Sequence, residues 1–450
     1  MIAPRLRLVL LLALVAVPLA TAAGLNRAFF PVSFLLTGFV LVAAIYDLAL
    51  GLGRYRDLQF SVPETLRGIR GEQIDLELRA HFLARRNDTL RLAIRFPEGF
   101  DPEHEQTVVP LTKASSEQVI HLSFVGTLRG AFHLESLNFD WRSPLGFWVH
   151  RDQRSLQCEV RIYPNLKAEG KQIARFLNRG AIGIHAQPQI GKGREFEKLR
   201  EYERGDSFDE INWKATAKRR FPVTKVFQLE RSKEVYLALD TSRLSARQLP
   251  EIYALKDAHP ITTTHLDRAI SAALLFCVAA ERQGDRFGLI SFSDKVNHLV
   301  KARAGPAHFN VCRDLAVSLL PHTVSPDFTD IAATLKQRIK RRSLFVFLTS
   351  LDDPVAAEDF VSAVEMLSRQ HLIIAVMIAP PLVQPLFGKG TIEDPDELYR
   401  KLAGHLSWAK LQNLQRVLAR KGVQFHVVSN QQLGLKLVSY YMDLKRRQTL

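Results

Sequence analysis

The sequence predicts an α/β fold: a doubly wound, mainly parallel sheet of the Rossmann type, preceded by an antiparallel β-sandwich and an N-terminal membrane hairpin of two helices. Three observations support this prediction. Two uncharged apolar runs open the chain, apolar and polar residues then alternate, and after residue 233 apolar strands alternate with helical segments. The predicted regions are residues 1–53, 57–164, 165–233 and 234–450, of which the third is a charged connector.

The first region contains the two apolar runs, Leu8–Ala23 and Ala28–Tyr46. As a helix the second run is about 28 Å long, close to the ~30 Å thickness of the hydrocarbon core, so it is long enough to span a membrane. The first run allows two interpretations. It is either a second span or, because Ala20–Ala22 resembles a signal-peptide cleavage site, a segment that is removed.

Basic residues flank these runs unequally. Arg5 and Arg7 precede the first run and Arg54 and Arg56 follow the second, whereas the connection carries only Arg27. The positive-inside rule then places both ends of the hairpin in the cytoplasm, and cleavage of the first run would leave the body on the same side. We therefore expect a two-pass protein of the inner, cytoplasmic membrane with a soluble body in the cytoplasm.

The charge balance favours acidic partners. A net charge of +15 is typical of proteins that meet nucleic acid or an anionic membrane surface. Nucleic acid ranks lower, because no recognition motif or array of stacking aromatics accompanies the bases. The cysteines are far apart and match no metal or redox spacing, so we expect packing residues in a reducing compartment: Cys158, Cys277 and Cys312.

The second region, residues 57–164, shows the alternation of half-buried strands. Apolar residues occupy every second position in Ile74–Phe82, Leu90–Phe96 and Val119–Val125, and Gly, Pro and Asn separate these stretches. The pattern predicts a small antiparallel sandwich. We find no catalytic constellation in it.

The connector sorts its charges. Arg194–Glu210 contains seven acids, whereas Ile211–Lys233 contains seven bases and one acid. Ser207 with Glu210 three residues later is a capping-box pattern, which predicts a helix that continues until Pro222. Such a helix would have an apolar docking side and a basic side.

Two functions remain open for this connector. It is either a salt-bridged joint between domains or a surface for a protein partner or anionic lipid headgroups. The candidate interface residues are Arg200, Tyr202, Gly205, Asp206, Asn212, Trp213, Lys214, Lys218 and Arg219.

The last region alternates strands and helices. Because its strands are continuously apolar, both of their faces are expected to be buried, as in a parallel sheet covered by helices on each side. The predicted strands are Glu234–Asp240, Arg286–Ser293, Ser343–Ser350, Leu372–Ala379 and Val423–Ser429. Predicted helices between them include Leu266–Gly284, Phe328–Lys340 and Ala356–Gln370.

Several motifs in this half resemble known families. LALDTSRLS, GDRFGLISFSD, FTDIAATL and FLTSLDDP are similar to the von Willebrand factor A-like fold. PLGFW at Pro144–Trp148, the YP pair at Tyr163 and Pro164, GREFEKLREYERGDSFDEINWKATAKRR and the closing YYMDLKRRQTL resemble the bacterial "domain of unknown function 58" family. The resemblance extends over roughly Pro144–Leu450.

The resemblance implies a partner but no reaction. It suggests a membrane-anchored protein that acts beside a MoxR-type AAA+ ATPase, in the assembly, maturation or stress handling of envelope or other complexes. The client protein stays unknown. Membrane lipids around the hairpin are the second expected partner.

The resemblance also implies a Mg²⁺ site at the strand ends. Domains of this type use an Asp-x-Ser-x-Ser loop, a Thr and a further Asp. Asp240, Ser242 and Thr329 match, but Leu244 and Ser350 occupy positions where oxygen ligands are usual. Because a hard cation needs a shell of oxygens, we expect weak binding at most.

Three functions follow from these observations. The main hypothesis is a noncatalytic adaptor whose strand-end loops bind a protein. Its rival is a metal-dependent enzyme that uses the Asp240 and Asp352 loops, in which Asp352 or Asp353 substitutes for the missing ligand if the loop turns inward. The third is a basic membrane protein that binds nucleic acid.

Overall fold

The structure is a computed structural model of the 450-residue chain. It describes all residues except 26–29, 53–54, 56–57, 82–87, 112–116, 182–194, 204–207, 229–232, 250–262, 382, 384, 386–394 and 448–450. The chain forms two compact units, Met1–Tyr163 and Pro164–Leu450. The predicted α/β class is confirmed.

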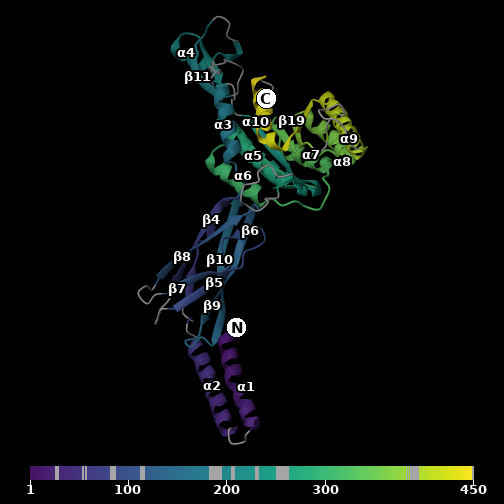
Figure 1. The fold of residues 1–450 in the computed structure, drawn as a ribbon. Helices are drawn as coiled ribbons and strands as arrows, with labels where there is room; N and C mark the ends of the chain where they lie inside the picture. Colours follow the sequence, from purple (N-terminus) through teal and green to yellow (C-terminus); the bar gives the residue numbers. More distant parts are fainter. Residues whose placement is uncertain are drawn as a thin grey trace. The chain divides into compact units, whose positions relative to one another are not determined.

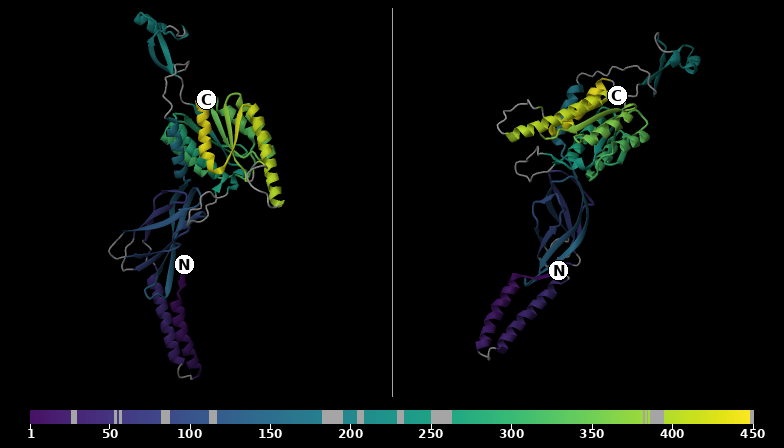
Figure 2. Two further views of the ribbon diagram at one scale, coloured as in Figure 1. Left: turned by 45° about the horizontal axis from the view of Figure 1, so that its top comes forward. Right: turned by 90° about the vertical axis from the view of Figure 1, so that its right-hand side faces the viewer.

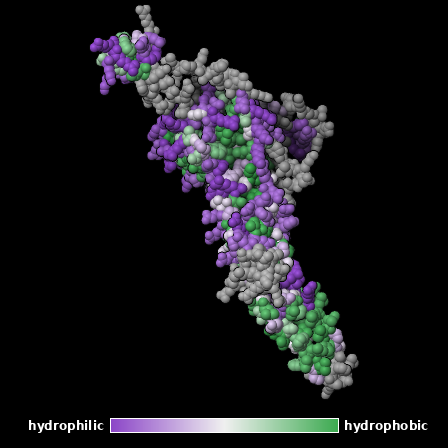
Figure 3. Space-filling model, turned by 90° about the vertical axis from the view of Figure 1, so that its left-hand side faces the viewer, coloured by the Kyte–Doolittle hydropathy of each residue, from purple (hydrophilic) through white to green (hydrophobic). Residues whose placement is uncertain are grey.

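The first unit begins with a short strand, β1 (Ile2–Pro4), and two apolar helices, α1 (Leu6–Leu25) and α2 (Phe30–Gly51), which lie side by side (Figure 1). Among the described residues, only Pro31–Gly51 is both long and apolar enough to cross a membrane. Hydrophobic residues dominate the surface of this helix pair (Figure 3). The second helix therefore indicates association with a membrane.

Two sheets packed face to face form the rest of this unit. One has the order β1-β10-β9-β5-β7, with β3 beside β10, and the other has the order β2-β4-β8-β6. Pairings are antiparallel except for β3 with β10. Residues of β4 are alternately exposed and buried, as the period of two predicts. The strands are β2 (Gln59–Ser61), β3 (Thr65–Ile69), β4 (Gln73–His81), β5 (Asp88–Ile94), β6 (Phe100–Pro102), β7 (Thr107–Leu111), β8 (Glu117–Gly126), β9 (Gly130–Arg142) and β10 (Trp148–Tyr163).

The second unit is built on a six-stranded sheet with the order β17-β16-β13-β18-β19-β20. All its pairings are parallel except that of the edge strand β17 with β16. The strands are β13 (Glu234–Asp240), β16 (Arg286–Phe292), β17 (Val296–Arg303), β18 (Leu344–Leu348), β19 (Leu372–Ile378) and β20 (Val423–Val428). β17 is not among the predicted strands, because its half-exposed residues lack a continuous apolar run.

Helices cover both faces of this sheet (Figure 2). Leu237 and Leu239 face the core that contains residues of α3, α5, α6 and α10, whereas Tyr236 and Ala238 face the core that contains residues of α7, α8 and α9. Within the segment predicted as a connector, α3 belongs to the first of these cores. The helices are α3 (Lys167–Ala181), α5 (His265–Arg282), α6 (Pro306–Ser318), α7 (Phe328–Arg338), α8 (Pro354–Ser368), α9 (Pro395–Arg420) and α10 (Leu433–Arg446).

The charged segment forms a hairpin of its own, β11 (Glu195–Glu201) with β12 (Val223–Gln228), and α4 (Trp213–Arg219) lies between the two strands in the sequence. The predicted helix start was wrong. Asn212 accepts from the Ala215 backbone N–H as the N-cap, so the helix begins after the 3₁₀ turn of Phe208–Glu210. Arg220 ends it in a left-handed conformation two residues before Pro222.

Candidate functional site

The candidate site lies where β13 and β18 end at the carboxyl edge of the parallel sheet. β13 is central, and the chain leaves it first for β16 and later returns beside it as β18. Such a reversal of strand order opens a crevice in which α/β proteins bind ligands. Asp240 ends β13, and Thr349 follows β18.

Asp240 is the central polar group of this edge. Its side chain is buried, one oxygen accepts from the Ser242 backbone N–H at 2.8 Å, and the other accepts from the Thr349 hydroxyl at 2.5 Å. Burial raises the pKa of the Asp240 carboxyl, while hydrogen bonds from Ser242, Thr349 and the Ser350 backbone limit this rise. The carboxylate therefore joins the ends of two adjacent strands.

The loop after Asp240 is closed by further internal contacts. The Ser245 hydroxyl donates to the Ser242 carbonyl at 2.7 Å, and the Leu244 side chain is buried where the von Willebrand pattern has a serine. Only a small cavity, of about 30 Å³, adjoins Asp240, Ser245 and Thr349. That space is comparable to the volume of a single water molecule.

Two arginines surround the opening of this edge. The Arg247 guanidinium donates to Asp352 at 2.5 Å, and Arg243 lies 3.5 Å from an oxygen of Asp353. Asp353 also accepts from the Val355 backbone N–H as the N-cap of α8. We call these two ion pairs the arginine rim. Both of the acids proposed as substitute metal ligands are thus paired with cations.

The hydroxyl of the predicted ligand Thr329 makes a different contact. Thr329 lies on α7, where its hydroxyl donates to Asp359 of α8 at 2.7 Å. The Phe328 backbone N–H binds the other oxygen of Asp359 at 2.7 Å. Asp359 therefore holds the start of α7 against α8, and the Thr329 hydroxyl is committed to that contact.

These contacts do not fit Mg²⁺. The ion needs about six oxygen ligands in near-octahedral geometry and gains affinity from carboxylates. Within the described ranges, no group of three or more His, Cys, Asp or Glu side chains could hold a metal ion. Asp240 is bound by hydrogen-bond donors, and the ion pairs of the arginine rim engage Asp352 and Asp353.

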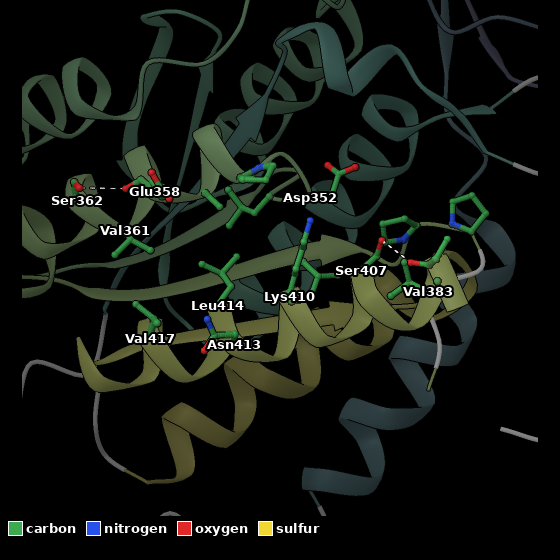
Figure 4. Close-up of a pocket in the computed structure, with 18 of the residues that line it drawn as sticks. Asp352, Glu358, Val361, Ser362, Val383, Ser407, Lys410, Asn413, Leu414 and Val417 are labelled. Carbon is green, nitrogen blue, oxygen red and sulfur yellow. Dashed lines mark hydrogen bonds between the residues drawn. The ribbon is translucent and has the colours of Figure 1, made fainter. Parts of the chain in front are cut away.

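A groove begins beside the arginine rim, and no sequence motif predicted it. Its volume is about 1100 Å³, and it runs between α8 and α9 from Asp352 and Leu351 (Figure 4). Ala357 and Val361 of α8 face apolar residues of α9, which the sequence analysis did not predict. The lining on α9 includes Leu411, Leu414 and Val417, with Arg400, Lys410 and Asn413 as polar members.

The predicted interface residues of the charged segment are mostly exposed. Trp213 is 62% exposed and lies 6.3 Å from the ring of Phe208, which is 70% exposed. None of the residues of α4 is buried, so the predicted apolar docking side stays a prediction. Lys214, Lys218 and Arg219 are exposed on the same short helix.

The remaining residues of that set have local roles. Arg200 on β11 pairs with Glu203 at 2.7 Å, the Tyr202 backbone N–H donates to Pro222, and Asn212 caps α4. Gly205 and Asp206 lie outside the described residues.

The fold and this edge define an α/β domain whose strand ends carry a closed polar cluster next to a groove. Residues 198–400 match the family described as "Protein of unknown function DUF58". This match confirms the resemblance predicted from the sequence motifs. No curated protein matches the chain.

Solved structures with similar parts are distant. A conserved hypothetical protein, BatB from Bacteroides thetaiotaomicron, is 12% identical with a TM-score of 0.29 and aligns over 48% of this chain and 100% of its own. An aerotolerance-related membrane protein from Bacteroides fragilis is 16% identical, with a TM-score of 0.28 and coverages of 46% and 98%. The SpRpn10 VWA domain is 10% identical, with a TM-score of 0.26 and coverages of 45% and 92%.

Proposed function

We propose that the protein is a membrane-anchored, noncatalytic adaptor that binds a protein partner at the arginine rim and the α8–α9 groove. The groove is the observation that supports this function most directly. At about 1100 Å³ it accommodates several side chains of a polypeptide, and its apolar walls meet polar residues at the margin. Interfaces between proteins have this composition.

The polar cluster supports binding in preference to catalysis. Asp240 is enclosed by donors and one oxygen of Asp352 is paired with Arg247, which favours binding over general-base catalysis. Recognition by this edge is therefore independent of Mg²⁺. The ion pairs of the arginine rim supply charge for choosing a partner.

The fold and the topology complete this proposal. The second unit is a doubly wound von Willebrand factor A-like domain; its strand order, its antiparallel edge and its two helical layers support this assignment. Both α1 and α2 cross the inner membrane, and the body is cytoplasmic. Arg5 before α1 and Arg7 in its first turn support that orientation.

The partner is a MoxR-type AAA+ ATPase, and the pair acts in the assembly or maturation of envelope or other complexes. This choice rests on the family match. The exposed Phe208 and Trp213, beside Lys214, provide a second contact surface on the charged hairpin.

Binding of purified ATPase to the detergent-solubilised protein tests the groove. Val361→Glu places a charge on the wall of the groove and should weaken binding at least tenfold. Val311→Glu on α6 is the matched control, because Val311 is exposed and lies outside the groove. Equal binding by both variants, with unchanged melting temperatures, would contradict a role for the groove. Cross-linking in native membranes then identifies the client.

A further inference from the structure

Two arginines lie beside a turn of the sandwich at the start of α1. The Arg5 backbone N–H donates to the Phe147 carbonyl at 2.8 Å, which fixes this part of the chain next to the PLGFW turn. A Cβ atom placed on Gly146 would lie 3.6 Å from Arg5 Nη1 and 3.7 Å from Arg7 Nη1. Both guanidinium groups therefore adjoin the same glycine.

This corner of the first unit has more cations than anions. Burial, followed by the charges of Arg142, Arg7 and Arg91, lowers the pKa of Arg5, and Asp140 acts in the opposite direction. Arg91 pairs with Asp140 in the sheet register, and Arg142 is two residues further along the same face of β9. Among the charges that shift this pKa, three guanidinium groups are opposed by one carboxylate.

Arg5 also has an unmet hydrogen-bonding requirement. Its Nη1 atom is buried and has no hydrogen-bond partner among the described residues. A buried, unpaired cationic donor is costly, so an anion that binds there gains both charge pairing and hydrogen bonds. The N–H donors of a planar guanidinium group can bind two oxygens of a phosphate at once, which a single neutral acceptor does not offer.

The neighbouring surface is apolar. Leu6 and Leu10, in the first turns of α1, are 71% and 58% exposed. The Trp148 indole N–H donates to the Ala44 carbonyl of α2 at 2.8 Å, which places an aromatic ring at this end of the helix pair. Tryptophan gathers at the interface between membrane and water, where headgroup phosphates lie.

We propose that Arg5, Arg7 and Arg142 bind the phosphate of an anionic phospholipid at the sandwich end of α1. The lipid's acyl chains lie along the exposed leucines of that helix. This site deepens the proposed membrane anchoring and rests on it. A free phosphate has the same anionic chemistry but gains nothing from the apolar surface, so the geometry favours the lipid.

Lipid retention by the full-length protein tests the site. The protein is placed in nanodiscs of phosphatidylglycerol and phosphatidylcholine, then released into detergent, and the bound lipids are counted by native mass spectrometry. The wild type should retain phosphatidylglycerol over phosphatidylcholine by on the order of tenfold, and Arg5→Gln with Arg7→Gln should abolish the preference. Arg79→Gln with Arg95→Gln removes the same charge from exposed sandwich positions and should leave the preference intact.

Two further measurements test the site independently of the double variant. Arg142→Gln changes an exposed strand position without touching α1, so it should reduce retention even if the double variant folds poorly. Wild-type retention of phosphatidylglycerol by both Arg142→Gln and a folded double variant would overturn the site. A different result would indicate that the arginines bind free phosphate: the wild type shows no preference between the two lipids, and excess inorganic phosphate displaces the lipid that is bound.

Carbonate extraction separates this inference from the proposed anchor. Protein that stays in the membrane pellet but shows no phosphatidylglycerol preference would overturn the lipid site alone. Wild-type protein that carbonate releases from the membrane would overturn the anchor and the lipid site together.

Discussion

Each unit of the molecule contains one buried aspartate that ties two elements together. Asp47 of α2 is 0% exposed and accepts from the Ser143 hydroxyl at 2.5 Å and the Leu145 backbone N–H at 2.7 Å. Asp240 is 4% exposed and accepts from the Thr349 hydroxyl and a backbone N–H. The two carboxylates thus have matching sets of partners.

The elements that they join are different. Asp240 connects neighbouring strands of one sheet, whereas Asp47 connects an apolar helix to the turn at Ser143–Phe147, and the Phe147 backbone N–H adds a third bond at 3.2 Å. Asp47 lies in the last turn of its helix, where the helix dipole disfavours negative charge. The same chemistry therefore organises a strand end in one unit and holds the membrane helix on the sandwich in the other.

Loss of Asp47 should have the largest effect. Asp47→Ala removes the acceptor of two part-buried backbone N–H groups and leaves the Ser143 hydroxyl with only its longer bond to the Trp148 carbonyl, at 3.2 Å. Each lost acceptor costs about 1–3 kcal/mol. We expect the first unit to lose about 3 kcal/mol or more of unfolding free energy, measured by thermal unfolding in detergent. Asp47→Asn keeps one oxygen acceptor and should fall between this variant and the wild type. A melting curve of Asp47→Ala that equals that of the wild type would show that the hydrogen bonds of Asp47 do not contribute to stability.

Asp240→Ala should cost less. Burial raises the pKa of Asp240, so the folded state holds the proton more tightly than the unfolded state. Stability from this group is therefore present at low pH and declines as pH rises through the raised pKa. At neutral pH the loss of its hydrogen bonds is partly offset by the removal of a buried charge, and we expect a net loss of about 1–2 kcal/mol.

The same variant tests the metal prediction. Calorimetric titration with Mg²⁺ should give no saturable heat with either the wild type or Asp240→Ala. Saturable heat that only the wild type shows would contradict the metal-independent rim and favour the enzyme hypothesis.

The two aspartates differ in how visible they are in the sequence. Asp240 stands at the end of a continuous apolar strand, within a motif that resembles a ligand loop, so it was predicted as a site residue. Asp47 directly follows the apolar run that ends at Tyr46 and was missed. The available signal was an acid in an apolar helix together with the PLGFW turn, whose amides only the folded chain brings to it.

Local motifs do not reveal contacts that depend on residues distant in the sequence. Thr329 matches a ligand position, but its hydroxyl is taken by Asp359, which lies thirty residues later in the sequence. The arginine rim was missed for the same reason, because Arg247 meets Asp352 only when the loops after β13 and β18 are adjacent. The alternation of strands and helices, in contrast, is indicated by the short-range periodicity of apolar residues, and the α/β class was therefore predictable.

A smaller effect is expected when the hydroxyl that donates to Asp47, or the one that donates to Asp240, is removed. Ser143→Ala and Thr349→Val each delete the side-chain donor to a buried carboxylate and leave its backbone donors in place. We expect each to lower the unfolding free energy by about 1 kcal/mol, measured from denaturant midpoints in detergent. A much larger loss for Ser143→Ala would show that its further acceptance of the Trp148 backbone N–H also stabilises the turn.

The smallest expected effect concerns the pH dependence of stability in the second unit. Burial lowers the pKa of His371, His426 and His265 in the second unit, so the folded state binds fewer protons there than the unfolded state. Their contribution to stability is present above about pH 6.5 and is lost as pH falls toward the depressed values. His371→Leu should reduce the slope of stability against pH by an amount that corresponds to at most one proton taken up on unfolding. Both ring nitrogens of His371 are buried without partners among the described residues. Melting of the second unit between pH 7 and 5, followed by calorimetry, measures the slope.

His322→Gln, at an exposed position, is the control and should retain the wild-type slope. An unchanged slope in His371→Leu would exclude this histidine as a source of the acid sensitivity.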